Sequence, residues 1–397
     1  MYLSQEKVGT FILAFMLLAL SAMSYVPSLE QMSLLVFVVS YMCFALFGFF
    51  CSGWWRSVSL SCLSLFILVL LAMVVNYFMS AIDGISTAKW FRSFASILFF
   101  VTLLFAPFYV RLLGVRKVCL LLLFSCFSYC FFLFVFNSDK FYEFMRVGGR
   151  LTFYLKDSVV PYPYVGVMLA VLLPGIGFAL RASLVGVFLF FVFAVGYKLQ
   201  ILFLFGFFLF LVFCYPGVIR KLFVSLLLMF TLVTVFFLAD DYIIQRFSSI
   251  GGGGDQVRML EIEYAWSIFQ SNPLWGGGLG LEVPLSDTRP NYAEQGDLWE
   301  SDSVSYIHNF PMYLLMVGGV TFFVLFLVLV RTAGVLSLRN LRSQDEYIQS
   351  VVWCSLGLIV FFTTSAAFKQ VQSIVLLSFF VVIFQALNNQ PRKVVYE

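Results

Sequence analysis

Residues 182–215 have the sequence ASLVGVFLFFVFAVGYKLQILFLFGFFLFLVFCY, a stretch of 34 residues in which Lys198 is the only charge. A helix that crosses a bilayer needs about 20 mostly apolar residues, so the stretch predicts two short membrane helices that meet at Gly196-Tyr197-Lys198. Helices are expected because an open sheet edge would leave backbone polar groups without partners in lipid. The stretch therefore predicts an all-α membrane protein.

The composition of the whole chain agrees with this prediction. Of the 397 residues, 62% are hydrophobic and 11% are charged, whereas soluble domains have roughly 45–50% apolar residues. A soluble enzyme and a disordered scaffold are excluded, and a net charge of +4 is too small to indicate a nucleic-acid partner. The eight cysteines lie in or beside apolar runs and the chain has one histidine, which excludes a disulfide framework and a His-rich metal site.

Twelve apolar segments predict about twelve membrane-spanning helices. They cover about 8–26, 32–53, 57–79, 94–110, 118–136, 160–180, 182–197, 199–216, 222–239, 309–330, 348–367 and 371–387. The first lacks a convincing small-residue cleavage site, so we expect a retained span and not a signal peptide. The predicted organisation is nine helices in 1–239, a large loop with short helices in 240–308, and three helices with a tail in 309–397.

The distribution of lysine and arginine predicts the orientation in the membrane. With a cytoplasmic N-terminus, thirteen of these residues fall in cytoplasmic segments and eight in the short loops of the other side. Both termini are therefore expected in the cytoplasm and the loop 240–308 outside it. This loop holds eleven of the twenty acids, three arginines and the only histidine. A structured loop of this length is usually functional, so we expect the chemistry there.

Arg258 and His308 are the first candidates for a catalytic role. Asp255 follows four glycines and is expected to be a helix N-cap, which would put Arg258 at the third helical position. A guanidinium beside the free N–H groups of a helix start can bind a phosphate or diphosphate; the alternative is an ion pair with Glu261 or Glu263 on a solvated face. His308 lies where the loop enters the tenth span, as a general base or as an interfacial residue bonded to water or headgroups.

Three further cations are candidates for binding a substrate phosphate. Lys198 interrupts its apolar stretch, where a charge is either functional or reaches the interface along its own alkyl chain. Arg246 and Arg150 lie close to predicted helix ends on the outer side. The glycine cluster Gly276–Gly280 has no strand–helix context for a nucleotide site and is expected to be a turn.

These pieces together resemble the O-antigen ligase and polymerase superfamily of bacterial envelope glycosyltransferases. Arg258 followed by Trp266, then Asn272-Pro273-Leu274 and Gly276–Gly280, resembles one family pattern. His308-Asn309, followed after nine residues by Gly319, resembles its His-Asn element at the entry of a span, and Lys198 stands where the family often has an arginine. The resemblance in sequence covers roughly 240–322, and elsewhere it is one of architecture.

The resemblance implies a specific activity. Such proteins have a GT-C-like membrane fold, use neither metal nor nucleotide, and transfer a glycan from undecaprenyl diphosphate at the outer face of the bacterial inner membrane. It implies that Arg258, with Lys198, Arg246 and Arg150, binds the diphosphate, and that His308 deprotonates the acceptor hydroxyl. The implied partners are the lipid-linked donor, a glycan or lipid A core acceptor, membrane lipids and a chain-length regulator.

The repeat-unit polymerase is favoured over the ligase that joins the chain to lipid A core, because this sequence departs from the family pattern at two ligase-like positions. Lys198 keeps the charge of an arginine but loses its bidentate fork, and Gly319 is followed by Val320 where a second small residue is often seen. Two other classes stay open. A transporter or flippase would carry polar groups near mid-membrane, and a non-catalytic scaffold would not need His308.

Overall fold

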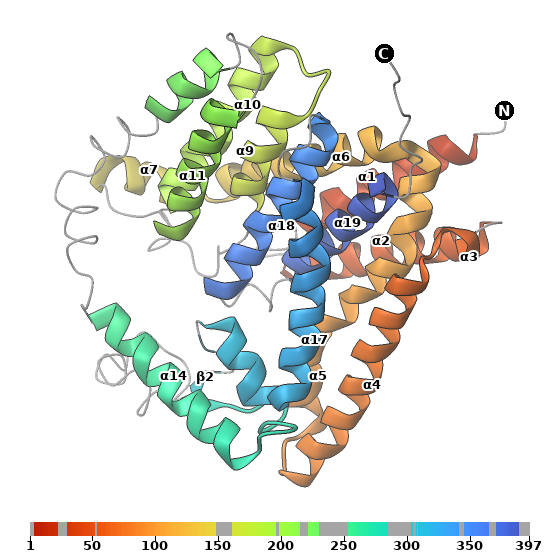
Figure 1. Cartoon of the computed structure of the whole chain (residues 1–397), viewed down its shortest axis with the longest axis vertical. Coiled ribbons are helices and arrows are strands. Elements are labelled where there is room, and N and C mark those ends of the chain that lie inside the picture. Colours follow the sequence, from red (N-terminus) through yellow and green to blue (C-terminus); the bar gives the residue numbers. More distant parts are fainter. Residues whose placement is uncertain are drawn as a thin grey trace.

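The computed structural model describes residues 4–22, 30–51, 54–147, 161–195, 198–214, 221–229, 253–284, 303–304, 307, 309–340, 345–364 and 371–388. Residues 221–229 are helical. The other elements, drawn in Figure 1, are the helices α1 (Gln5–Ala22), α2 (Glu30–Phe50), α3 (Trp54–Ser57), α4 (Leu60–Ile82), α5 (Thr87–Leu98), the 3-10 helix η2 (Phe99–Val101), α6 (Thr102–Phe136), α7 (Ser138–Val147), α9 (Tyr162–Leu172), α10 (Phe178–Val195), α11 (Lys198–Cys214), α14 (Gly253–Ser271), α17 (Phe310–Asn340), α18 (Glu346–Thr364) and α19 (Val371–Asn388), with the strands β1 (Val283–Pro284) and β2 (Ser303–Val304).

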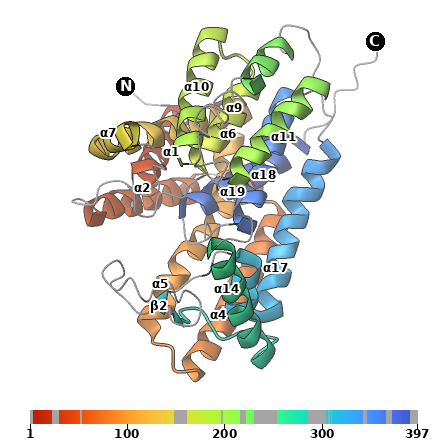
Figure 2. The ribbon, with the colours of Figure 1, turned by 90° about the vertical axis from the view of Figure 1, so that its left-hand side faces the viewer.

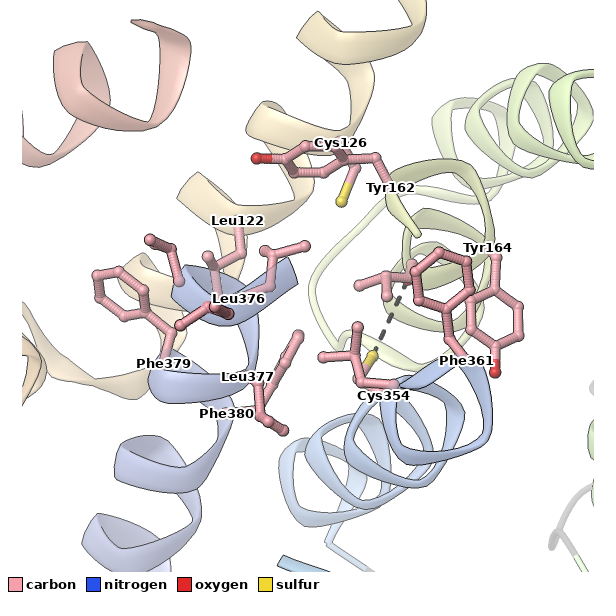
Figure 3. Close-up of a cluster of buried hydrophobic side chains, with 14 of the residues drawn as sticks. Leu122, Cys126, Tyr162, Tyr164, Cys354, Phe361, Leu376, Leu377, Phe379 and Phe380 are labelled. Carbon is pink, nitrogen blue, oxygen red and sulfur yellow. Dashed lines mark hydrogen bonds between the residues drawn. The ribbon is translucent and has the colours of Figure 1, made fainter. Parts of the chain in front are cut away.

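The core is built around α6, α9 and α19. Helix α6 packs against α1, α19 and α9, and α18 packs against α17, α9 and α19. Every residue of α9 is buried, as expected for a helix that is apolar all round. Figure 3 shows side chains of α6, α9, α18 and α19 meeting, with the Cys354 thiol 3.9 Å from the carbonyl oxygen of Val165.

The structure confirms an all-α protein with apolar helices suited to a membrane. Within the described residues, four helical segments are long and apolar enough to cross a bilayer: Gln5–Ala22, Ser33–Phe50, Phe99–Phe136 and Phe310–Val328. Six shorter apolar helices accompany them: Phe66–Ile82, Tyr162–Leu172, Phe178–Ala194, Gln200–Phe213, Glu346–Phe362 and Val371–Leu387. The count of twelve spans, the GT-C-like architecture and the three-part organisation stay predictions.

Three of the predicted segments differ from the observed helices. Residues 102–110 of the first segment and the whole of 118–136 fall in one helix, α6, which is kinked at Gly114 (φ 79°), so the chain changes direction at one residue and needs no separate loop. Residues 94–101 belong to α5 and η2. The segment 160–180 is interrupted, because α9 ends at Leu172. The guanidinium of Arg181 donates to the carbonyl oxygens of Val171 and Leu173, both at 2.8 Å, and a cation so placed satisfies the last carbonyls of a helix.

The predicted loop 240–308 contributes a helix and a short hairpin at one end of the molecule. Figures 1 and 2 place α14, β2 and α5 at this end, opposite α9 and α10. Strand β1 pairs antiparallel with β2, Val283 opposite Val304, and α14 packs against α17. The described part of the loop therefore packs against α17, the helix that follows it.

Candidate active site

Helix α14 carries Arg258 on its exposed side. The face with Val257, Glu261 and Ala265 is buried, whereas Arg258 is exposed and forms no salt bridge with a described residue. The alternative ion pair with Glu261 or Glu263 is therefore not formed. The expected N-cap at Asp255 is wrong, because α14 already begins at Gly253; the two glycines join the helix, and Arg258 lies in its second turn.

After α14 the chain forms a tight turn from Asn272 to Gly280, which we call the glycine turn. Its backbone is hydrogen-bonded to α17: the Gly277 N–H donates to the Met316 carbonyl oxygen at 2.7 Å and the Gly278 N–H to that of Val317 at 3.1 Å. In the other direction, the Val320 N–H donates to the Pro273 carbonyl oxygen at 2.9 Å. The turn expected at Gly276–Gly280 is confirmed; these five residues are buried against α17, whereas Asn272, Pro273 and Leu274 are exposed.

Helix α17 is open to the glycine turn because it is kinked at Gly319. This residue has φ 58° and ψ −154°, which breaks the i to i−4 ladder and frees backbone groups on both sides. A β-carbon at Gly319 would lie 2.6 Å from the carbonyl oxygens of Leu274 and Pro273, and one at Gly276 (φ 64°) would lie 2.6 Å from the Gly318 nitrogen. Both positions therefore require glycine, by backbone conformation and by space.

The glycine turn is also held against α17 by a side chain that was not among the predicted site residues. Asn76 of α4 is buried; its amide nitrogen donates to the Val317 carbonyl oxygen at 2.8 Å, and its amide oxygen accepts the Leu279 N–H at 3.0 Å. The same oxygen accepts the indole N–H of Trp90 and the hydroxyl of Ser80, both at 3.2 Å. The sequence does contain one indication of this role: Asn76 is an amide within the apolar segment 57–79, where a polar side chain is energetically unfavourable and usually functional.

The start of α17 is well defined, but His308 lies outside the described residues. Its neighbour Ile307 is buried, and the side-chain oxygen of Asn309 accepts the Met312 N–H at 3.1 Å as the N-cap of α17. Close by in sequence, Ser303 of β2 donates to the Glu282 carboxylate at 3.2 Å, and Lys89 of α5 forms a salt bridge with it at 2.9 Å. Residues 282 and 303 of the predicted loop are thus joined to each other and to α5, shortly before α17 begins.

The remaining predicted site residues are only partly placed. Lys198 is the first residue of α11, as expected from the break at Gly196-Tyr197, and its side chain is not described. Arg246 and Arg150 lie outside the described residues. Of the five predicted residues, Arg258 alone is placed with its side chain, so the described residues bring no two of them together.

Two comparisons with known proteins complete these observations. Residues 182–327 match a family model described as O-antigen ligase, and no curated protein matches the chain. The matched residues run from α10 into α17 and include α14, the glycine turn and Gly319, but not Asn76 or Lys89. The match confirms the resemblance inferred from the sequence motifs.

Proposed function

We propose, from the premise that residues 182–327 match the O-antigen ligase family, that this membrane protein transfers a glycan from undecaprenyl diphosphate to an acceptor hydroxyl. The match indicates a membrane glycosyltransferase of the O-antigen ligase and polymerase type. The observation that carries the finer proposal is the exposed guanidinium of Arg258 on α14, the helix whose following turn is bonded into α17. The residue after His308 is the N-cap of that same α17.

The proposed chemistry assigns one role to each end of the bond that breaks. As the bond between the anomeric carbon and the diphosphate oxygen breaks, negative charge develops on the diphosphate and Arg258 stabilises it, assisted by Lys198, Arg246 and Arg150. Fixed positive groups aimed at a developing charge lower the barrier without reorganisation. His308 accepts the proton of the acceptor hydroxyl as its oxygen forms the new bond to the anomeric carbon. This reaction needs no metal and no nucleotide.

We infer the repeat-unit polymerase as the specific activity, with the O-antigen ligase as the second candidate. Lys198 supports this choice, since a lysine cannot bind a phosphate with the bidentate fork of the arginine that the family often has there. In the proposed setting the protein lies in the bacterial inner membrane with both termini in the cytoplasm and the site facing the periplasm. The acceptor is then a lipid-linked glycan, and a chain-length regulator is a proposed partner.

The test is substitution of the two proposed catalytic residues in cells that assemble surface polysaccharide. Arg258→Ala and His308→Ala are each expected to reduce transfer by roughly 10²–10³-fold, the effect typical of losing one group that stabilises the transition state. Met259→Ala is the matched control, because Met259 is the exposed neighbour of Arg258 on α14. Membrane insertion is checked for each variant by fluorescence of a fused reporter.

The pattern of products on a polysaccharide gel distinguishes the candidates. A polymerase defect leaves single repeat units attached to the lipid A core, whereas a ligase defect leaves the core bare while long chains accumulate on the carrier lipid. If Arg258→Ala and His308→Ala both insert and both give polysaccharide of normal chain length, the proposal that the protein is an enzyme is refuted and a non-catalytic scaffold is favoured. A transporter would show no transfer when the purified protein is given lipid-linked donor and acceptor in detergent, where no second compartment exists.

A further inference from the structure

The amide of Asn76 uses both of its chemical functions at once. Its nitrogen donates to Val317 of α17 and its oxygen accepts N–H groups of Leu279 in the glycine turn and of Trp90 in α5. A carboxylate at this place would offer acceptors only, and an aliphatic side chain would offer neither function. The three segments that meet here are therefore joined by a group that no apolar residue replaces.

The environment strengthens these bonds. Asn76 is 1% exposed, and within a buried site of low dielectric a hydrogen bond is stronger than in water, while an unpaired polar group is costly. The Val317 carbonyl oxygen accepts from both Asn76 and the Gly278 N–H, two residues before the kink at Gly319. Asn76 consequently acts at the point where α17 has lost its own helical bonds.

The two elements joined here lead directly to the two proposed catalytic residues. The glycine turn continues α14, which carries Arg258, and α17 begins at Phe310, after its N-cap Asn309, the residue next to His308 in the sequence. A shift of either element changes the placement of its catalytic group. Misplacement of a reacting group by about 1 Å can cost about a hundredfold in rate.

We propose that Asn76 is a positioning residue for glycan transfer, which sets α14 and α17 relative to each other by holding the glycine turn in the kink of α17. The proposal rests on the proposed function and adds to it a residue from α4, outside the part of the chain that matches the family. Asn76 acts through the backbone of Val317 and Leu279 and does not contact substrate.

The test uses Asn76→Asp in the purified full-length protein with a synthetic undecaprenyl-diphosphate oligosaccharide as donor. Aspartate has the shape of asparagine and keeps the acceptor for Leu279 and Trp90, but it replaces the amide NH2 by an oxygen. When ionised it has no donor for Val317, and when protonated, as burial favours, it has a single O–H in place of the two amide N–H groups. We expect kcat to fall about ten- to a hundredfold, with KM for the donor changed less than about threefold, because Asn76 makes no contact with the donor. Hydrogen exchange at the backbone of 273–281 should rise in the same variant.

The matched control is Ser125→Ala. Ser125 of α6 is also a buried polar residue bonded to a neighbouring helix, with its hydroxyl 2.8 Å from that of Ser21 and 3.2 Å from the Leu17 carbonyl oxygen in α1. Its loss should lower the melting temperature but leave both kcat and the exchange of 273–281 unchanged. If Asn76→Asp does not insert into the membrane, Asn76→Ser is measured in its place, because a smaller polar side chain leaves room for a water molecule. We expect the same fall in kcat for this variant.

The outcomes separate this inference from the proposed function. If Arg258→Ala and His308→Ala abolish transfer while a folded Asn76 variant keeps the kcat of the original protein, the positioning role is wrong. A fall in kcat matched by Ser125→Ala would likewise refute it, as a general loss of stability. If Arg258→Ala and His308→Ala stay active, the proposed function is wrong. Independently of that result, unchanged hydrogen exchange of 273–281 in the Asn76 variant would refute the role of Asn76 in holding the glycine turn.

Discussion

Gly276 and Gly319 show how two single residues determine the geometry of the site. Each has a positive φ, and each approaches the backbone of the other's segment so closely that a β-carbon would overlap it. A left-handed conformation costs a residue other than glycine roughly 1–2 kcal/mol even without such overlap. In the middle of an ordinary helix, by contrast, a glycine lowers stability relative to alanine, because it adds flexibility to the unfolded chain.

Gly276→Ala should therefore destabilise the protein by more than about 2 kcal/mol, from the conformational cost and the overlap with Gly318. Gly186→Ala is the control, because Gly186 lies within α10 and a β-carbon there would meet no atom within 4 Å; it should stabilise by about 0.5–1 kcal/mol. The measurement is the thermal midpoint of the detergent-solubilised protein. Equal midpoints for the two variants would contradict the close approach of the glycine turn to α17.

At the scale of an element, the start of α17 depends on Asn309. Its side-chain oxygen accepts the Met312 N–H, and replacing an N-cap asparagine by alanine typically costs about 0.5–2 kcal/mol. We expect Asn309→Ala to lower the thermal midpoint accordingly. Asn309→Asp should not, because it keeps the acceptor and places a negative charge at the positive end of the helix. Equal loss in both variants would show that the cap does not determine the stability of α17.

The salt bridge between α5 and the loop is expected to contribute less to stability than the N-cap of α17. Lys89 and Glu282 are both substantially exposed, with side chains 50% and 42% accessible, and pairs of this kind typically contribute about 0.2–1 kcal/mol. Lys89→Ala should change the thermal midpoint by less than Asn309→Ala does. High salt should reduce the difference between Lys89→Ala and the original protein, and a midpoint shift larger than that of Asn309→Ala would contradict this ranking.

At the scale of the whole molecule, the predicted orientation can be tested by fusions. Alkaline phosphatase is active only after export, so a fusion after residue 297 should be active and a fusion after residue 397 inactive. A green fluorescent reporter should show the reverse pattern, since it fluoresces when it folds in the cytoplasm. Activity of the phosphatase at residue 397 would contradict the orientation derived from lysine and arginine, and with it the periplasmic placement of the proposed site.

The apolar helices were predictable because a helix that is shielded from water, by lipid or by other helices, must be built mostly from apolar residues. The run 371–387 is predominantly apolar, and α19 occupies it almost residue for residue. The glycine turn was recognised only as a turn, because its partners in α17 are backbone groups, which carry no signature of residue type. Asn76 lies some two hundred residues from Leu279 in the chain, and one sequence gives no information about such a pairing.

The complete burial of α9 constrains the order in which the protein is assembled during synthesis. Helix α9 packs against α6 and α10, which are made before or soon after it, but also against α18, which emerges almost two hundred residues later. A β-carbon at Gly357 of α18 would clash with the side chain of Tyr164, so the two helices fit closely. Until α18 arrives, that face of α9 stays in contact with lipid, and ribosome-bound chains that end before residue 346 should leave Tyr164 open to lipid-soluble labels.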